Sequence, residues 1–255
     1  MALEIITVPC RTDNYAFLLH NAETGQTAVV DAPEVPAIEA ALKTRGWELS
    51  DILITHHHDD HIAGVDALRA RFGARVIGAA ADAYRLPKLD LALTEGEVVV
   101  VCGEAASVID VSGHTLGHIA FYFAASHAAF TADSLMALGC GRLSEGTAAQ
   151  MWASMQKLRA LPADTLICSG HEYTANNARF AMTIEPGNPD LVARVAAITA
   201  ARAQGRFTVP SLLALEQQTN PYLRADVPAL AAAIGMTGAD PADIFAEVRR
   251  RKDKF

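Results

Sequence analysis

The 255-residue sequence predicts a strand-rich α/β domain followed by a small all-α domain. Up to about residue 170, short β-branched runs alternate with turn-forming residues, and some of the intervening stretches have helical spacing. After residue 172 the strand signals end, and alanine-rich stretches are separated by loops that contain proline. We therefore expect one domain at residues 1–172 and a second, helical domain at residues 173–255.

The expected elements follow from these local signals. Strands are expected at residues 5–8, 16–20, 28–31, 52–55, 76–78, 98–102, 107–111, 119–123, 128–131 and 166–169. Helices are expected at 36–44, 63–72 and 147–161, and in the second domain at 173–183, 189–204, 211–218, 227–234 and 241–251. Gly46 and Gly73 suit the left-handed residue that ends a helix, and Pro162 cannot continue one.

The charge balance and the cysteines limit the partners and the compartment. A net charge of −8 argues against broad binding to nucleic acid or to anionic membranes. The longest apolar runs have the length of a strand, so no membrane span is expected. Four widely spaced cysteines and an N-terminus without a secretory pattern predict reduced thiols in a cytoplasmic protein. We also expect a monomer.

The strongest chemical signal is the pattern H-x-H-x-D-H, formed by His56, His58, Asp60 and His61. It follows an apolar strand and precedes an expected helix. Imidazoles and carboxylates gathered this densely repel one another and lose hydration unless a cation binds them. Neutral histidine and aspartate are usual ligands of first-row metal ions, so the pattern predicts a metal site.

Three further candidate ligands lie at the ends of later strands: His114, Asp133 and His171. Strand ends hold a side chain in place, and glycine neighbours let the backbone turn close to an ion. Five histidines and two aspartates are too many for one tetrahedral zinc ion. They suit two divalent ions that share a bridging carboxylate, with zinc expected and iron or manganese as alternatives.

Together these residues resemble the metallo-β-lactamase superfamily, an αβ/βα sandwich with a dinuclear metal site, and within it the glyoxalase II (hydroxyacylglutathione hydrolase) family. The resemblance covers essentially the whole chain. The segments that carry it lie at 113–119, 131–135, 139–142, 145–147, 170–174, 176–177, 185–188 and 249–255. The helical second domain is also a feature of glyoxalase II.

The resemblance implies a role for each candidate residue. One metal ion would be held by His56, His58 and His114, and the other by Asp60, His61 and His171, with Asp133 bridging. Substrate binding would fall to Arg142, Ser144, His171, Tyr173, Arg249 and Lys252. Arg142 stands where the family usually has lysine, and Ser144 where an aromatic residue is common. The first domain would then be the metal-binding catalytic domain and the second the substrate-binding domain.

The implied activity is hydrolysis of an S-(2-hydroxyacyl)glutathione, such as S-lactoylglutathione, in methylglyoxal detoxification. A hydroxide held by the two ions would attack the thioester carbonyl, with Asp60 and Asp133 as the catalytic carboxylates. One alternative is another hydrolase of the superfamily, such as a lactonase or a β-lactamase. A second is a mononuclear iron dioxygenase that acts on glutathione persulfide, and a third is a non-enzymatic or nucleic-acid-processing protein. The acidic balance and the complete ligand set argue against the third.

Overall fold

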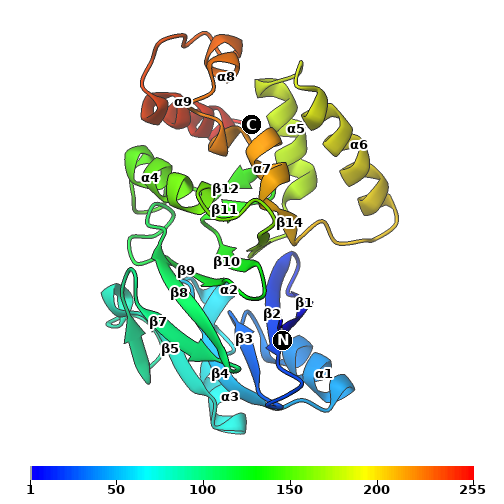
Figure 1. Cartoon of the computed structure of the whole chain (residues 1–255), viewed down its shortest axis with the longest axis vertical. Helices are drawn as coiled ribbons and strands as arrows, with labels where there is room; N and C mark the ends of the chain where they lie inside the picture. Colours follow the sequence, from blue (N-terminus) through cyan, green and yellow to red (C-terminus); the bar gives the residue numbers. More distant parts are fainter. Residues whose placement is uncertain (1) are drawn as a thin grey trace. The chain divides into compact units, whose positions relative to one another are not determined.

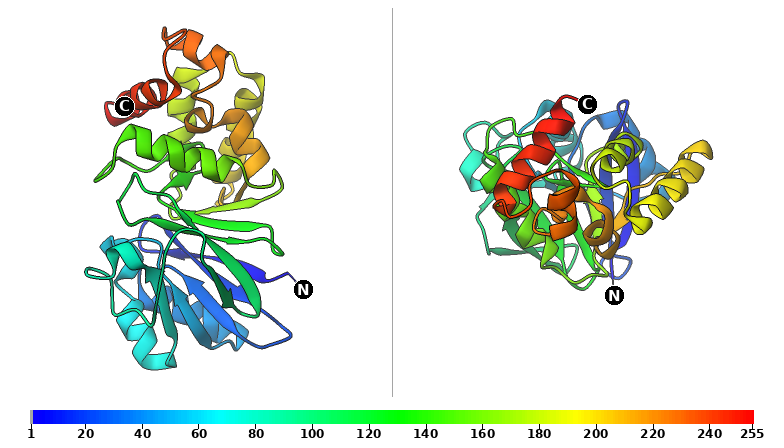
Figure 2. Two further views of the ribbon diagram at one scale, coloured as in Figure 1. Left: turned by 60° about the vertical axis from the view of Figure 1, so that its left-hand side comes forward. Right: turned by 90° about the horizontal axis from the view of Figure 1, so that it is seen from above.

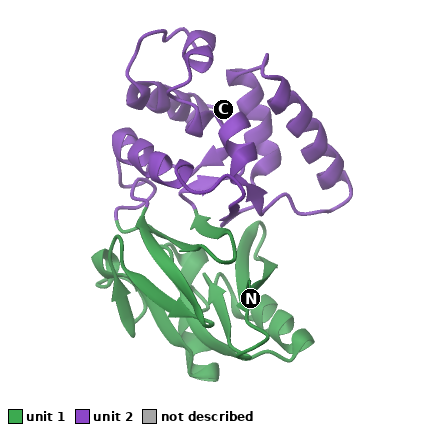
Figure 3. Cartoon of the chain, in the orientation of Figure 1, with its two compact units in different colours: residues 1–110, 117–132 green, residues 111–116, 133–255 purple. Residues whose placement is uncertain are grey.

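The computed structural model describes residues 2–255, which divide into two compact units (Figure 3). Unit 1 comprises the residues up to 110 together with 117–132, and unit 2 comprises 111–116 and 133–255. In chain order, unit 1 contains β1 (Glu4–Cys10), β2 (Asn14–His20), β3 (Thr27–Val30), α1 (Val35–Arg45), β4 (Leu49–Leu53), α2 (Asp59–Ile62), α3 (Val65–Phe72), β5 (Arg75–Ala79), the 3₁₀ turn Ala80–Asp82, β6 (Leu91–Leu93), β7 (Val98–Val101), β8 (Glu104–Asp110), β9 (Ile119–Phe123) and β10 (Ala128–Ala132) (Figure 1).

The first sheet of unit 1 has the strand order β1-β2-β3-β4-β5-β6. β1, β2 and β3 pair antiparallel, whereas β3, β4, β5 and β6 pair parallel. Parallel strands end at the same edge of a sheet, so a crossover connection must return the chain between them, as α1 does between β3 and β4 and α3 between β4 and β5. The glycine signals were correct, because α1 ends at Gly46 with φ of 69° and α3 ends at Gly73 with φ of 67°.

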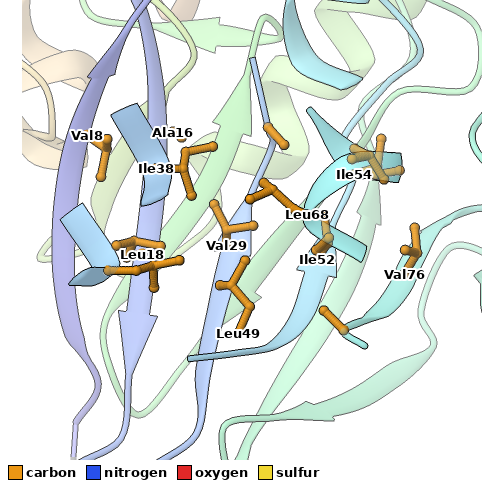
Figure 4. Close-up of a cluster of buried hydrophobic side chains, with 14 of the residues drawn as sticks. Val8, Ala16, Leu18, Val29, Ile38, Leu49, Ile52, Ile54, Leu68 and Val76 are labelled. Atoms are coloured by element: carbon orange, nitrogen blue, oxygen red, sulfur yellow. The ribbon is translucent and has the colours of Figure 1, made fainter. Parts of the chain in front are cut away.

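Helices α1 and α3 cover this sheet and form its main core (Figure 4). Ile38 of α1 and Leu68 of α3 are fully buried against apolar side chains of the strands, among them Leu18, Val29 and Ile52. This packing removes the apolar face of each short helix from water, which contributes more to its stability than intrinsic propensity does.

The second set of strands in unit 1 has the order β10-β9-β8-β7, paired antiparallel throughout. Phe17 on β2 meets Phe130 on β10 edge to face, with ring centroids 5.6 Å apart. The inner faces of the two sets of strands therefore pack on each other, as the expected sandwich requires. The region described includes no helix with the length and apolar character that crossing a bilayer requires.

Unit 2 holds mainly helices, together with two short strand pairs. In chain order, it contains β11 (Leu135–Met136), β12 (Gly139–Cys140), α4 (Ala148–Arg159), β13 (Leu166–Ser169), α5 (Thr174–Ile184), α6 (Pro189–Ala203), β14 (Ser211–Leu212), α7 (Leu213–Thr219), the 3₁₀ turn Pro221–Leu223, α8 (Pro228–Ala233) and α9 (Pro241–Asp253). Helix α4 begins at a capping box formed by Thr147 and Gln150. It packs against α9 (Figure 2). The ring centroids of Trp152 on α4 and Phe245 on α9 lie 6.2 Å apart.

The expectation of a helix that begins at residue 211 was wrong by two residues. Ser211 and Leu212 form β14, which pairs antiparallel with Ile167 and Leu166 of β13. The short strands β6, β11 and β12 also lie outside the expected runs. Segments of two or three residues are too short to show periodicity, so only pairing with a partner strand makes them recognisable.

Candidate metal and substrate site

The histidine-rich segment of unit 1 lies between β4 and α2, at the edge where β3 also ends. The parallel register places Val30 beside Leu53, so Asp31 and Thr55 follow neighbouring strand ends. The Asp31 carboxylate accepts hydrogen bonds from the Thr55 backbone N–H at 2.9 Å and from its hydroxyl at 2.8 Å. Asp31 therefore holds the start of the turn that carries the histidines.

Asp31 also orients His61. The Nδ1 atom of His61 lies 2.8 Å from Asp31 Oδ2, and both side chains are buried. A carboxylate at this distance places the ring proton on Nδ1, so Nε2 carries the lone pair that a metal ion needs. One ligand atom each from Asp31, His56 and His61 lie within 4.8 Å of one another.

His56 and His58 present ring nitrogens toward the same point, with 3.2 Å between Nε2 of His56 and Nδ1 of His58. Zinc–nitrogen distances of about 2.0–2.1 Å in a tetrahedral site place neighbouring ligand atoms about 3.3–3.4 Å apart. The observed separation matches that edge. The His56 ring also stacks on His118, with centroids 4.6 Å apart, and its Nδ1 lies 3.0 Å from the Thr55 hydroxyl.

Asp60 lies on the first turn of α2 and is held by Asn14. The Asn14 amide nitrogen lies 3.0 Å from both the backbone carbonyl and Oδ2 of Asp60. Asn14 is buried at the start of β2, so it fixes the half-buried Asp60 carboxylate from a rigid strand. The Asp60 Oδ2 atom is 3.9 Å from Nε2 of His61.

In unit 2, Asp133 lies between two histidines. Its Oδ2 atom is 3.3 Å from Nε2 of His171 and 3.6 Å from Nε2 of His114. All three side chains are buried, and both separations are close to the ligand–ligand edge of a metal site. A carboxylate oxygen that faces two imidazoles at these distances suits a metal ligand.

His114 is oriented by a backbone group. Its Nδ1 atom lies 2.8 Å from the carbonyl oxygen of Arg142, which directs Nε2 toward Asp133. Gly141 makes this approach possible, because a Cβ there would collide with the Asp133 carbonyl and lie 3.0 Å from the His114 ring. The Ser144 N–H also donates to the His114 carbonyl at 3.2 Å.

Within each unit, the candidate histidines and aspartates fit the ligand requirements of first-row divalent metal ions. Each candidate ligand offers a ring nitrogen or a carboxylate oxygen, and the distances within each unit suit such an ion. Asp31, Asn14 and the Arg142 carbonyl support these ligands, and none of these three supporting roles was expected from the sequence. The one available signal was the position of Asp31 at the end of an expected strand.

Comparison with known proteins places the chain in a family. Residues 14–171 match the family model of the metallo-beta-lactamase superfamily, and residues 172–255 match that of the hydroxyacylglutathione hydrolase C-terminus. A curated protein of Cereibacter sphaeroides named hydroxyacylglutathione hydrolase is 64% identical over 255 residues, with all of both chains covered. The chain belongs to the hydroxyacylglutathione hydrolase family of the metallo-beta-lactamase superfamily.

Two further similarities agree with this assignment. A Ruegeria pomeroyi protein, also named hydroxyacylglutathione hydrolase, is 60% identical over the full length of both chains. The crystal structure of BLEG-1 B3 metallo-beta-lactamase superposes with a TM-score of 0.67 at 21% identity, covering 86% of this chain and 99% of that one. The structural similarity confirms the metallo-β-lactamase fold.

The family's candidate substrate residues in unit 2 differ in exposure. The Tyr173 ring stacks on His171, with centroids 4.6 Å apart and planes tilted by 7°, and Tyr173 is 39% exposed. Arg142 and Ser144 are exposed on the loop that follows β12. An exposed arginine and a phenol beside a candidate metal ligand suit the recognition of a charged peptide.

Arg249 and Lys252 both lie on α9 but have different environments. Arg249 is 5% exposed, and its guanidinium donates to the Cys140 carbonyl at 3.0 Å and to Asp253. Lys252 is half-buried, with Nζ 5.2 Å from the Phe180 ring centroid and hydrogen-bonded to the Asn176 side chain. Arg249 thus supports the β12 backbone, whereas the Lys252 ammonium is the more accessible cation.

The four cysteines of this family member do not have the environment of an activated nucleophile. All four are free and buried. Burial raises the pKa of the Cys140 thiol to about 11, despite the nearby Arg249 guanidinium. A thiol with that pKa stays protonated near neutral pH, so Cys140 is a structural residue under the loop that carries Arg142.

Proposed function

We propose that the chain hydrolyses S-(2-hydroxyacyl)glutathione thioesters, such as S-lactoylglutathione, to glutathione and a 2-hydroxy acid. The observation that carries the proposal is the full-length identity of 64% to a protein named hydroxyacylglutathione hydrolase. The match of residues 172–255 to the C-terminal model of that family favours this activity over a lactonase or β-lactamase. In a cell, the reaction would complete the detoxification of methylglyoxal.

The proposed metal ligands are divided between two sites. His56, His58 and His114 would hold one ion, and Asp60, His61 and His171 the other, with Asp133 shared. The two ions, zinc in this proposal, would supply an activated water near neutral pH and a Lewis acid for the thioester carbonyl. Asp31 and the Arg142 carbonyl would keep His61 and His114 in the tautomers that ligate through Nε2.

Substrate binding is proposed for the charged and aromatic residues of unit 2. The Arg142 guanidinium and the Lys252 ammonium would bind the glutathione carboxylates, since a protein of net charge −8 needs a local cationic patch for an anion. Tyr173 would present its ring and hydroxyl to the peptide, and Ser144 its hydroxyl. Arg249 would act indirectly, because its hydrogen bond to the Cys140 carbonyl supports the loop that carries Arg142 and Ser144.

The two domains expected from the sequence would have different roles, and the enzyme would be cytoplasmic. Residues 1–172 would carry the metal ions and residues 173–255 the main substrate contacts, in agreement with the limits of the two family matches. Four free, buried cysteines are in keeping with a reducing compartment, which supports a cytoplasmic enzyme.

A single preparation of purified protein tests the proposal. We expect about two divalent ions per chain and metal-dependent cleavage of S-lactoylglutathione. A simple lactone, a β-lactam and glutathione persulfide serve as alternative substrates. Turnover of any of these at a higher kcat/KM than the glutathione thioester would contradict the proposal. Elemental analysis distinguishes zinc from iron or manganese, and size-exclusion chromatography tests the expected monomer.

The pH dependence of substrate binding follows from Lys252. Burial, together with the Arg249 and Arg179 charges, lowers the pKa of Lys252 to about 8. The ammonium is charged below that pH and is lost above it, so KM for the glutathione thioester should rise by about 10-fold between pH 7 and pH 9. A Lys252→Arg variant keeps its charge over this range and should show a flat KM. The same rise in both proteins would contradict a role for Lys252 in binding.

A further inference from the structure

The β11–β12 hairpin of unit 2 connects two parts of the candidate site. Asp133 precedes the hairpin, and Arg142 follows it. Leu135 pairs with Cys140 and Met136 with Gly139, and the Gly141 N–H donates to the Ser134 carbonyl at 3.2 Å. The tip is strained, because Leu138 has φ of 55°, in the left-handed region that residues with a Cβ rarely adopt.

Buried polar side chains from the helices bind the backbone of this tip. The Asn220 amide nitrogen lies 3.0 Å from the Met136 carbonyl and 3.1 Å from the Gly139 carbonyl. The Asn177 amide donates to the Ala137 carbonyl at 3.1 Å. The hairpin thus has its carbonyl groups bound from two different helical segments.

Glu216 of α7 completes this set of contacts. Its carboxylate accepts the Leu138 N–H at 2.9 Å and the Asn220 amide at 3.0 Å. The other carboxylate oxygen accepts hydrogen bonds from Arg194 and from the Ser211 hydroxyl. Glu216 is fully buried and Arg194 is 5% exposed, so the ion pair is shielded from water and holds Glu216 in one orientation.

The hairpin in turn positions His114. The residues after it place the Arg142 carbonyl 2.8 Å from His114 Nδ1, and His114 Nε2 faces Asp133 Oδ2 at 3.6 Å. Gly141 lies directly against the Asp133 carbonyl and the His114 ring. A shift of the hairpin would therefore move the group that orients His114 and, with it, the exposed Arg142 side chain.

We propose that Asn177, Glu216 and Asn220 are positioning residues, which hold the β11–β12 hairpin so that the Arg142 carbonyl orients His114 for metal binding. The proposal rests on the proposed function for the identity of the metal ligand and of the substrate. Asn177, Glu216 and Asn220 are not themselves proposed metal ligands, but they would influence metal binding through the hairpin. Partners that orient a metal-binding histidine commonly contribute about 10–100-fold to metal affinity or activity.

The test compares two amide deletions with a matched control. Asn220→Ala removes the contacts with the Met136 and Gly139 carbonyls, and Asn177→Ala removes the contact with Ala137. Asn188→Ala is the control, because the Asn188 amide also donates to a backbone carbonyl, that of Gln218, and its side chain caps α6. The control therefore loses comparable hydrogen bonds in the same unit without touching the hairpin.

Metal retention is measured on folded protein by competition with a chelator. The values of kcat and KM are measured with the glutathione thioester as substrate. We expect about 10-fold weaker metal retention and a higher KM in Asn220→Ala, a smaller change of the same kind in Asn177→Ala, and retention like that of the wild type in Asn188→Ala. If Asn220→Ala does not fold, Asn177→Ala decides. Equal retention and kinetics in both hairpin variants and the control would overturn the proposal. A retention difference in a protein that does not hydrolyse the thioester would support positioning and contradict the proposed function.

Discussion

Asp133→Ala is expected to remove most of the activity and part of the bound metal together. The Asp133 carboxylate faces both His114 and His171, so its loss removes one ligand from each proposed ion. We expect the metal content to fall from about two ions per chain to about one or fewer. The kcat/KM for the glutathione thioester should fall by about 10³-fold, because loss of a bound ion would remove a Lewis acid that stabilises the developing oxyanion.

Asp226→Asn provides the control for this variant. Asp226 is an exposed carboxylate of the same unit, paired with Arg159 rather than with the candidate ligands. It should keep both ions and its turnover, since the loss is confined to one ion pair near the surface. Two ions per chain and normal turnover in Asp133→Ala would show that the shared-ligand assignment is incorrect.

Lys252→Ala is expected to give the second largest effect, and to give it in KM. The Lys252 ammonium is part of α9, remote in sequence from the proposed ligands, so we expect it to contribute to binding rather than to chemistry. A charge-assisted hydrogen bond to a carboxylate is worth about 1.5–3 kcal/mol, which corresponds to a decrease of about 10–150-fold in kcat/KM. The measurement compares S-lactoylglutathione with a lactoyl thioester that lacks the glutathione carboxylates.

The truncated substrate separates recognition from folding. Wild type should process it poorly, and Lys252→Ala should change its kcat/KM little. Equal losses on both substrates would mean that Lys252 supports the fold, through its contacts with Asn176 and the Phe180 ring. Arg249→Ala is a less specific probe, because the buried guanidinium also holds the Cys140 carbonyl and its loss would disturb the loop that carries Arg142.

The fold class and the set of candidate ligands could be predicted from the amino-acid sequence alone. Both depend on neighbours along the chain: His56, His58, Asp60 and His61 lie within one turn after a strand, and Gly46 and Gly73 end helices where they stand. Such signals can be recognised in the sequence because a strand end, a helix cap or a dense ligand motif is formed by residues only a few positions apart.

The groups that support those ligands could be recognised only in the folded chain. Asp31 reaches His61 across 30 residues because β3 and β4 lie side by side in parallel register. Asn220 reaches the Met136 carbonyl across 84 positions, and Arg249 was expected to face substrate but is buried under β12. Buried polar groups must find hydrogen-bond partners wherever the packed chain brings them, and neither hydrophobic periodicity nor local propensity specifies which partner that is.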